Sequence, residues 1–325
     1  MSYTPPPHTG YTFPGPQNLH NDIYPSINPS LTPSLHQPGK VVLITGAGRG
    51  IGRAIALQYA HARVSCIILC ARTGRELDEV EERVREIDDS VTVQKHTVDV
   101  TSASDVQAMA EKVKATSKSR LDVLVNNAGA SCPWVPITDV DAKEWWSTLE
   151  VNLRGPFNFL HAFLPLLVDT AETLDVPVNV VNVTSIGAHM VSPGASAYQI
   201  SKLAVLRLCE SVDVEFAAKG VQCVGVHPGG VLTTMSEKVE SLRPSKLAPH
   251  HSHRRVSSKR DLLTPETTVL NDTPELCGGF IVWLTAQQRA WLNARYVSAT
   301  WDVDALVGME KEIVHGNKLK MFMSV

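Results

Sequence analysis

From Lys40 onward, short runs rich in valine and isoleucine alternate with longer segments of helical periodicity. Several of the short runs are apolar nearly throughout, as expected for strands that are buried on both faces of a parallel sheet. The predicted strands are, in chain order, KVVLITG, VSCIILCA, VTVQKHTVDV, LDVLVNNAG, VPVNVVNVTS, VQCVGVHPGG and RYVSATW.

Amphipathic helices are predicted between these strands. In GRELDEVEERVREID, apolar side chains fall on one stripe of a helix, formed by Leu77, Val80, Val84 and Ile87. Alternating strands and helices predict an α/β fold, in which a parallel sheet carries helices on both sides. Because no internal repeat or linker interrupts the pattern, residues 40–325 are expected to form one domain.

Two stretches differ from this pattern. Residues 1–39 hold nine of the twenty prolines and no sustained apolar run, which predicts a disordered or loosely attached tail. Residues 233–275 are less regular and contain RPSKLAPHHSHRRVSSKR. The histidines and arginines there suggest a metal or phosphate site, but a mobile, solvated loop beside the substrate is the preferred interpretation.

Composition narrows the class of protein. The chain has 325 residues, is 43% hydrophobic and carries a formal net charge of -3, which is typical of soluble globular proteins and argues against nucleic acid as a partner. With no secretory segment and no apolar stretch long enough to span a membrane, an intracellular, cytoplasmic protein is expected. Six cysteines without a CxxC pair predict free, buried thiols and no zinc-type site.

The first strand runs directly into TGAGRGIG and then into the helical segment RAIALQYA. Gly46, Gly50 and Gly52, with Ile51 between the last two, allow a tight turn whose backbone can approach a pyrophosphate at the start of the helix. A merely tight turn is the alternative. The position between strand and helix favours a dinucleotide-binding loop.

The end of the second strand indicates which dinucleotide binds. It reads CAR, ending in Arg72, and the nearest acids, Glu76 and Asp78, belong to the next helix. Arg49 in the glycine loop adds a second guanidinium. Two arginines without a carboxylate favour NADP(H), because they can bind its 2'-phosphate. If both arginines are only solvated surface residues, NAD(H) remains the alternative cofactor.

The stretch SAYQISK places Tyr198 and Lys202 one helical turn apart, which alone is compatible with an ordinary amphipathic helix. Together, however, TGAGRGIG, NNAG at 126–129, the YxxxK of 198–202 and a serine thirteen residues before the tyrosine resemble the short-chain dehydrogenase/reductase family. The resemblance extends from about Lys40 to about Trp301. It implies a doubly wound, Rossmann-type NAD(P)-binding fold in which one domain holds both cofactor and active site.

The resemblance also implies catalytic roles. Tyr198 would be the general acid in carbonyl reduction or the base in alcohol oxidation, and Lys202 would hold the nicotinamide ribose and favour the tyrosinate electrostatically. Ser185 would hydrogen-bond the substrate oxygen. Asn152 would connect the lysine to solvent through water, unless it is a buried amide that ties helix to strand.

Further cofactor contacts follow from the same resemblance. Asp99 would lie beside the adenine, and Asn126 at the end of the fourth strand would support the centre of the sheet. The backbone of Val231 and the hydroxyl of Thr233 would meet the nicotinamide carboxamide, and Thr233 also fits a helix N-cap.

Candidates for the substrate pocket are Cys132, Trp134, His189, Met190 and Met235. Tryptophan and methionine would suit a fairly apolar carbonyl or alcohol. His189 is a candidate polar anchor, although a surface or satisfied core histidine is the preferred interpretation.

The sequence therefore predicts an NADP(H)-dependent, metal-independent oxidoreductase that interconverts a small-molecule ketone or aldehyde with an alcohol. The alternatives are an NAD-linked alcohol dehydrogenase, a non-catalytic dinucleotide-binding regulator, and a partner-docking role for the tail or the basic loop. The ending YVSATWDVDAL and the Pro-rich lead resemble fungal members, many of which act in specialised metabolism. Homo-oligomers are usual in the family, but this altered ending argues against the usual tetramer.

Overall fold

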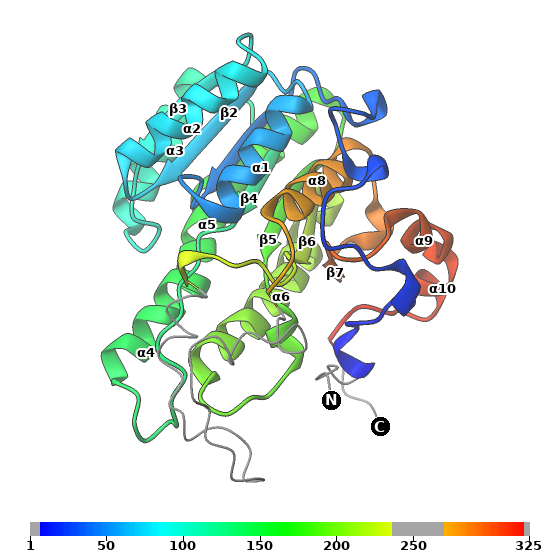
Figure 1. The fold of residues 1–325 in the computed structure, drawn as a ribbon. Coiled ribbons are helices and arrows are strands. Elements are labelled where there is room, and N and C mark those ends of the chain that lie inside the picture. Colours follow the sequence, from blue (N-terminus) through cyan, green and yellow to red (C-terminus); the bar gives the residue numbers. More distant parts are fainter. Residues whose placement is uncertain (1–6, 236–269, 322–325) are drawn as a thin grey trace.

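The computed structural model describes residues 7–235 and 270–321, with a parallel sheet at the centre (Figure 1). All seven predicted strands are present, in the spatial order β3-β2-β1-β4-β5-β6-β7. Their bounds are β1 (Val41–Thr45), β2 (Cys66–Ala71), β3 (Thr92–Thr97), β4 (Val123–Asn126), β5 (Val178–Val183), β6 (Val221–His227) and β7 (Tyr296–Ser298). The strand order reverses between β1 and β4, which is where ligands bind in sheets of this kind.

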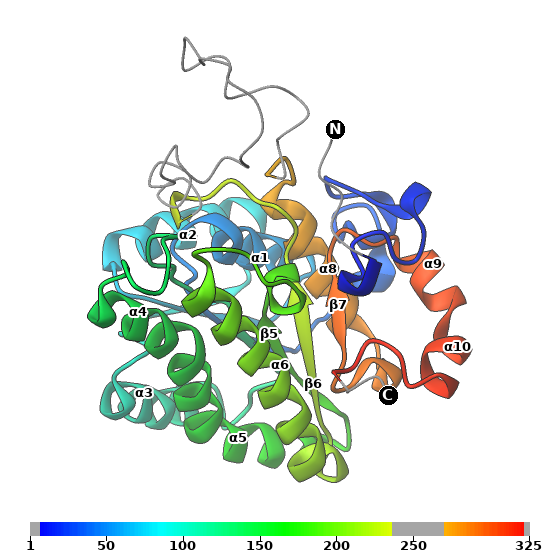
Figure 2. The same ribbon diagram turned by 90° about the horizontal axis from the view of Figure 1, so that it is seen from below.

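Helices cover both faces of the sheet, as predicted (Figure 2). Side chains of α1 (Gly50–His61), α2 (Gly74–Ile87) and α8 (Pro274–Ala286) fill the core on one face. The other face is covered by α3 (Ala103–Thr116), α5 (Gly155–Leu174) and the later part of α6 (Ser196–Phe216). Three shorter helices are α4 (Ala142–Leu149), α9 (Val303–Gly308) and α10 (Glu310–His315).

The N-terminal segment, residues 7–39, packs against the C-terminal part of the chain (Figure 1). It forms four 3-10 turns that each begin with proline: η1 (Pro7–Thr9), η2 (Pro16–Asn18), η3 (Pro25–Ile27) and η4 (Pro33–Leu35). Ile27 and Leu35 are 0% and 3% exposed and join the core beside α8. This packing contradicts the prediction of a loosely attached tail. Isolated apolar residues between prolines follow neither helical nor strand periodicity, so the pattern gave no signal of their burial.

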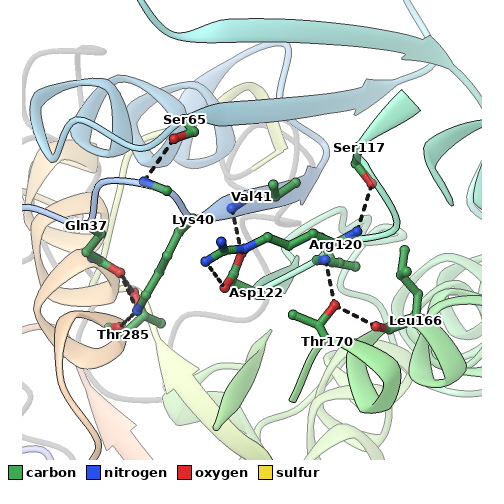
Figure 3. Close-up of polar contacts among 12 residues, drawn as sticks. Gln37, Lys40, Val41, Ser65, Ser117, Arg120, Asp122, Leu166, Thr170 and Thr285 are labelled. Carbon is green, nitrogen blue, oxygen red and sulfur yellow. Dashed lines mark hydrogen bonds and ion pairs between the residues drawn. The ribbon is translucent and has the colours of Figure 1, made fainter. Parts of the chain in front are cut away.

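A polar network fixes this segment where it enters β1 (Figure 3). Lys40 Nζ donates to Gln37 Oε1 at 3.0 Å and to the carbonyl of Thr285 at 2.5 Å, and burial lowers the pKa of Lys40 to about 8. Asp122 accepts two bonds from Arg120, at 2.8 and 2.9 Å, and a third from the first amide of β1. The network joins the N-terminal segment, β1 and α8 at the amino edge of the sheet.

Several further predictions concern the chain as a whole. All six cysteines are free and buried, as predicted. Within residues 7–235 and 270–321, no helix is long and apolar enough to cross a membrane, and no group of three His, Cys, Asp or Glu side chains is placed to hold a metal ion. Most of the predicted substrate loop at 233–275, including its basic cluster, lies outside the described residues.

Candidate active site

The structure brings the predicted catalytic residues together at the carboxyl edge of the sheet. Tyr198 and Lys202 lie one turn apart in the first part of α6, and Lys202 Nζ is 5.7 Å from the centre of the Tyr198 ring. Ser185 follows β5 and hydrogen-bonds the Tyr198 side chain. Asn152 belongs to a short π-helix, η5 (Glu150–Arg154), between α4 and α5. Such π-helical turns occur frequently at functional sites.

Burial sets the protonation of the tyrosine and the lysine. Burial raises the pKa of Tyr198, and the hydrogen bond from Ser185 opposes that rise only in part. Lys202 is 4% exposed, donates to the carbonyl of Val183 at 2.9 Å and has its pKa lowered by burial to about 8. At neutral pH the phenol therefore holds its proton, and the lysine is mostly a cation.

Ser185 is held by the turn that follows it. It caps the 3-10 helix η6 (Ile186–His189), and its Oγ accepts the amide of Gly187 at 3.0 Å. A Cβ atom at Gly187 would lie 3.3 Å from Ser185 Oγ and 3.6 Å from Tyr198 Cε1. The position of η6 therefore sets the direction of the serine hydroxyl.

Asn152 is 1% exposed, and both polar atoms of its side chain are hydrogen-bonded to neighbouring residues. Its Oδ1 accepts the amide of Ala130 at 2.7 Å, while its Nδ2 donates to the carbonyl of Ala130 at 2.9 Å and to Ser201 Oγ at 3.0 Å. The side chain thus ties η5 to the loop after β4 and to α6. A Cβ atom at Gly129 would lie 3.6 Å from Asn152 Oδ1 and 3.8 Å from Lys202 Nζ, so the asparagine and the lysine flank the same glycine.

The glycine loop forms a turn that side chains would block. Gly46 has φ 65°, and a Cβ atom there would lie 2.9 Å from Cα of Ala128; at Gly52 it would lie 2.1 Å from the Gly46 oxygen. Asn127 pins the turn, because its Nδ2 donates to the carbonyls of Thr45 at 2.9 Å and Gly46 at 3.2 Å. Asn127 was not singled out in the sequence, although it is the second residue of NNAG.

This turn fits a dinucleotide pyrophosphate. The N-cap residue of α1, Arg49, makes no side-chain bond to the helix end, so its own side chain does not compete with an anion there. Gly50 has φ 54°, and a Cβ atom on it would lie 3.6 Å from Thr233 Cγ2. The structure thereby brings Thr233 beside the glycine loop.

The predicted phosphate-binding arginines both have a carboxylate in their surroundings. Arg49 Nη1 lies 3.3 Å from Glu76 Oε1, with 61% and 29% of these side chains exposed. Arg72 lies near enough to Asp99 to help lower the pKa of that carboxyl. The expectation of two arginines without a carboxylate is therefore wrong. Glu76, in the first turn of α2, reaches back over the glycine loop.

Asp99 and Asn126 are both held by neighbouring polar groups. Asp99 Oδ1 accepts the amide and the hydroxyl of Thr101, at 2.9 and 2.8 Å, and the backbone bond is the main reason that its pKa is lowered. Asn126 is 3% exposed and donates to Asn182 Oδ1 at 2.8 Å, which joins β4 to β5. Its side chain supports the sheet.

An aspartate that the sequence did not single out holds the loop after β6. Asp272 Oδ2 accepts the amide of Gly230 at 2.6 Å, and Val231 pairs with Asp272 in an isolated parallel bridge. Burial raises the pKa of Asp272 to about 6. Asp272 belongs to no motif, so its role depends on the fold alone.

Among the candidate pocket residues, Trp134 lies beside the catalytic cluster, with its ring centre 6.4 Å from that of Tyr198. Cys132 is buried, while Met190 and Met235 are half-buried. The ring of His189 packs edge-on against Tyr296 at 4.4 Å, and burial lowers its pKa to about 4. These contacts favour the core interpretation of His189 over a polar anchor.

Residues 40–243 match the model of the family described as short chain dehydrogenase. Over 321 residues the chain is 39% identical to short chain dehydrogenase citE of Monascus ruber, covering 97% of this chain and 98% of that protein. It is 34% identical over 319 residues to short chain dehydrogenase andI of Emericella variicolor, covering 95% and 96%. The Pseudomonas aeruginosa RhlG/NADP complex has the same fold, with a TM-score of 0.68 at 22% identity over 82% of this chain and 97% of that one.

Proposed function

The chain belongs to the short-chain dehydrogenase family of NAD(P)-dependent oxidoreductases, and we propose that it uses NADP(H) to interconvert a ketone or aldehyde with an alcohol. The observation that carries the proposal is the cluster of Ser185, Tyr198 and Lys202 at the carboxyl edge of the sheet. Its protonated phenol and buried cation suit proton donation to a carbonyl oxygen.

The described residues fit the cofactor at several points. The glycine loop would hold the pyrophosphate, Arg49 and Arg72 the 2'-phosphate, and Lys202 the nicotinamide ribose. Asp99 would border the adenine, and Val231 and Thr233 the nicotinamide carboxamide. When bound, the cofactor supplies or takes up the hydride.

The protein side chains transfer the proton and stabilise the charge that the transfer leaves behind. In reduction, Tyr198 donates its phenolic proton to the substrate oxygen, and the Ser185 hydroxyl hydrogen-bonds the same oxygen and orients it. The Lys202 ammonium favours the tyrosinate that this transfer leaves behind. Since burial raises the pKa of Tyr198, the proton is in place at neutral pH, which favours the reductive direction.

We expect the substrate to be a fairly apolar carbonyl compound, because Trp134 lies beside Tyr198. A role in fungal specialised metabolism is part of the proposal, supported by the similarity to Monascus and Emericella dehydrogenases. The test is an NADPH-oxidation screen over ketones and aldehydes, including terpenoid and polyketide carbonyls. The proposal predicts turnover with NADPH above that with NADH. Faster turnover with NADH on every accepted substrate would contradict it.

The ion pair between Arg49 and Glu76 favours the rival NAD-linked enzyme, because a carboxylate near the adenosine ribose repels a 2'-phosphate. Two substitutions separate the alternatives. Arg72→Ala is expected to weaken NADPH binding by about 10- to 100-fold, because it removes one charge-assisted hydrogen bond to the 2'-phosphate. It should leave NADH binding nearly unchanged. Glu76→Gln should tighten NADPH binding a few-fold, as exposed ion pairs contribute only about 0–1 kcal/mol.

Fluorescence titration of both cofactors measures these affinities without turnover. Glu79→Gln is the matched control, since Glu79 lies three positions after Glu76 in α2 and pairs with the exposed Arg75 at 3.4 Å. It should change neither affinity. Equal losses of NADPH and NADH binding in Arg72→Ala would show that the arginine does not recognise the 2'-phosphate.

A further inference from the structure

The N-terminal segment is fastened to the residues that follow β7. Tyr24 Oη donates to the carbonyl of Trp301 at 3.2 Å and accepts the amide of Val303 at 2.8 Å. The His20 ring stacks on Tyr24, and its Nε2 lies 2.8 Å from Asp302 Oδ2. Because these bonds join elements about 280 positions apart, the segment is an integral part of the C-terminal structure.

A line of four rings continues from this segment to the catalytic edge. Trp301 is 0% exposed, and its Nε1 donates to the carbonyl of Gly10 at 3.1 Å. Its ring centre lies 4.9 Å from that of Phe13 and 5.8 Å from that of Tyr296, both edge-on. Tyr296 in turn packs edge-on against His189 at 4.4 Å. Each such pair contributes about 0.5–1.5 kcal/mol beyond its burial.

The first turn of the segment also contacts η6 directly. His8 Nε2 lies 3.2 Å from the carbonyl oxygen of His189, the last residue of η6, and η1 lies against η6. Thr9 beside it is 1% exposed. At its other end, η6 is capped by Ser185, whose Oγ accepts the amide of Gly187. The N-terminal segment and the catalytic serine thus hold opposite ends of one four-residue turn.

We infer that His8 and Phe13 of the N-terminal segment position Ser185, by holding η6 in place through the His8 bond and through the rings of Phe13, Trp301, Tyr296 and His189. Phe13 and His8 are positioning residues, since neither touches Ser185 itself. Loss of the His8 bond or of the Phe13 ring contact makes the C-terminal end of η6 mobile and shifts the Gly187 amide. The Ser185 hydroxyl then no longer points toward the substrate oxygen. The catalytic part of this inference rests on the proposed function.

The first test is hydrogen exchange in Phe13→Ala, followed by mass spectrometry of peptides that cover η6. Exchange there should be about 3- to 10-fold faster than in the wild type, as expected for the loss of one aromatic pair. Tyr11→Ala is the matched control, because Tyr11 is an exposed aromatic residue of the same segment. It should leave η6 protected, and unchanged η6 exchange in Phe13→Ala would overturn the inference.

The second test uses the full-length enzyme with NADPH and an accepted carbonyl substrate. His8→Leu and Phe13→Ala are expected to lower kcat by about 10-fold, because the Ser185 hydroxyl is displaced from its productive position. The Kd for NADPH should be unchanged. His8→Gln, which keeps a donor, and Phe13→Tyr, which keeps the ring, should retain most of the rate. A variant that merely loses stability would instead lower the active fraction and the melting temperature with kcat per folded enzyme unchanged, which would also overturn the inference.

Ser185→Ala separates this inference from the proposed function. If Ser185→Ala keeps the wild-type rate, the proposed role of the serine fails, whatever the N-terminal variants do. If Ser185→Ala loses turnover while His8→Leu and Phe13→Ala keep it, the proposed function stands and the positioning role of the N-terminal segment is wrong.

Discussion

Tyr198→Phe is expected to lower kcat for carbonyl reduction by about 1,000-fold and to leave the Kd for NADPH within about twofold. General acid catalysis by a positioned side chain contributes about 10²–10⁴-fold, and this substitution removes the only acidic proton of Tyr198. The ring remains, so its packing beside Trp134 is kept. Steady-state kinetics on a substrate from the carbonyl screen, with fluorescence titration of NADPH, measure the two quantities.

A second buried tyrosine provides the matched control for this substitution. Tyr59 is 0% exposed and shares a hydrogen bond of 2.8 Å with Thr285 Oγ1, far along the chain from the catalytic cluster. Tyr59→Phe removes the same hydroxyl and is expected to cost about 1 kcal/mol of stability with kcat unchanged. A wild-type rate in Tyr198→Phe would exclude Tyr198 as the proton donor. Absence of turnover in the wild type on every carbonyl would instead favour the non-catalytic regulator.

The parts of the fold that local patterns determine could be predicted from the sequence. Apart from the edge strand β3, the strands are apolar because both faces of the sheet are covered, and the glycine loop needs glycine where φ is positive or where another backbone lies close. Tyr198 and Lys202 meet because one helical turn separates them. In each of these cases the signal and the contact lie within a few residues of one another.

Contacts between distant segments could not be predicted in this way. Glu76 was assigned to the next helix correctly, but its approach to Arg49 depends on how α2 packs beside the glycine loop. Asp272 reaches Gly230 from 42 positions further along the chain, and Ile27 is buried because α8 and α9 lie beside its turn. The proline-rich composition of residues 7–39 predicted disorder, since composition carries no information about a partner surface elsewhere in the chain.

Lys202 gives the second large expected effect, and its pH dependence identifies it. The ammonium is the form that favours the tyrosinate, and burial lowers its pKa to about 8, so the useful charge is present below that pH and lost above it. The wild-type kcat/KM for reduction is therefore expected to be level below about pH 7 and to fall as the pH rises through about 8. The phenol of Tyr198, whose pKa burial raises, still holds its proton over this range.

Lys202→Met should lower kcat by about 100- to 1,000-fold below about pH 7, with a smaller difference above about pH 8 where the wild-type lysine loses its charge, and should weaken NADPH binding because the proposed ribose donor is removed. Lys202→Arg keeps a cation whose pKa lies well above that of lysine, so whatever rate it retains should no longer fall near pH 8. The matched control is Lys40→Met, since Lys40 is partly buried and also has a pKa lowered to about 8, but lies at the amino edge of the sheet (Figure 3). Lys40→Met should reduce stability and keep the alkaline fall in rate. If the fall persists in Lys202→Arg, another group controls it, and the electrostatic role assigned to Lys202 is wrong.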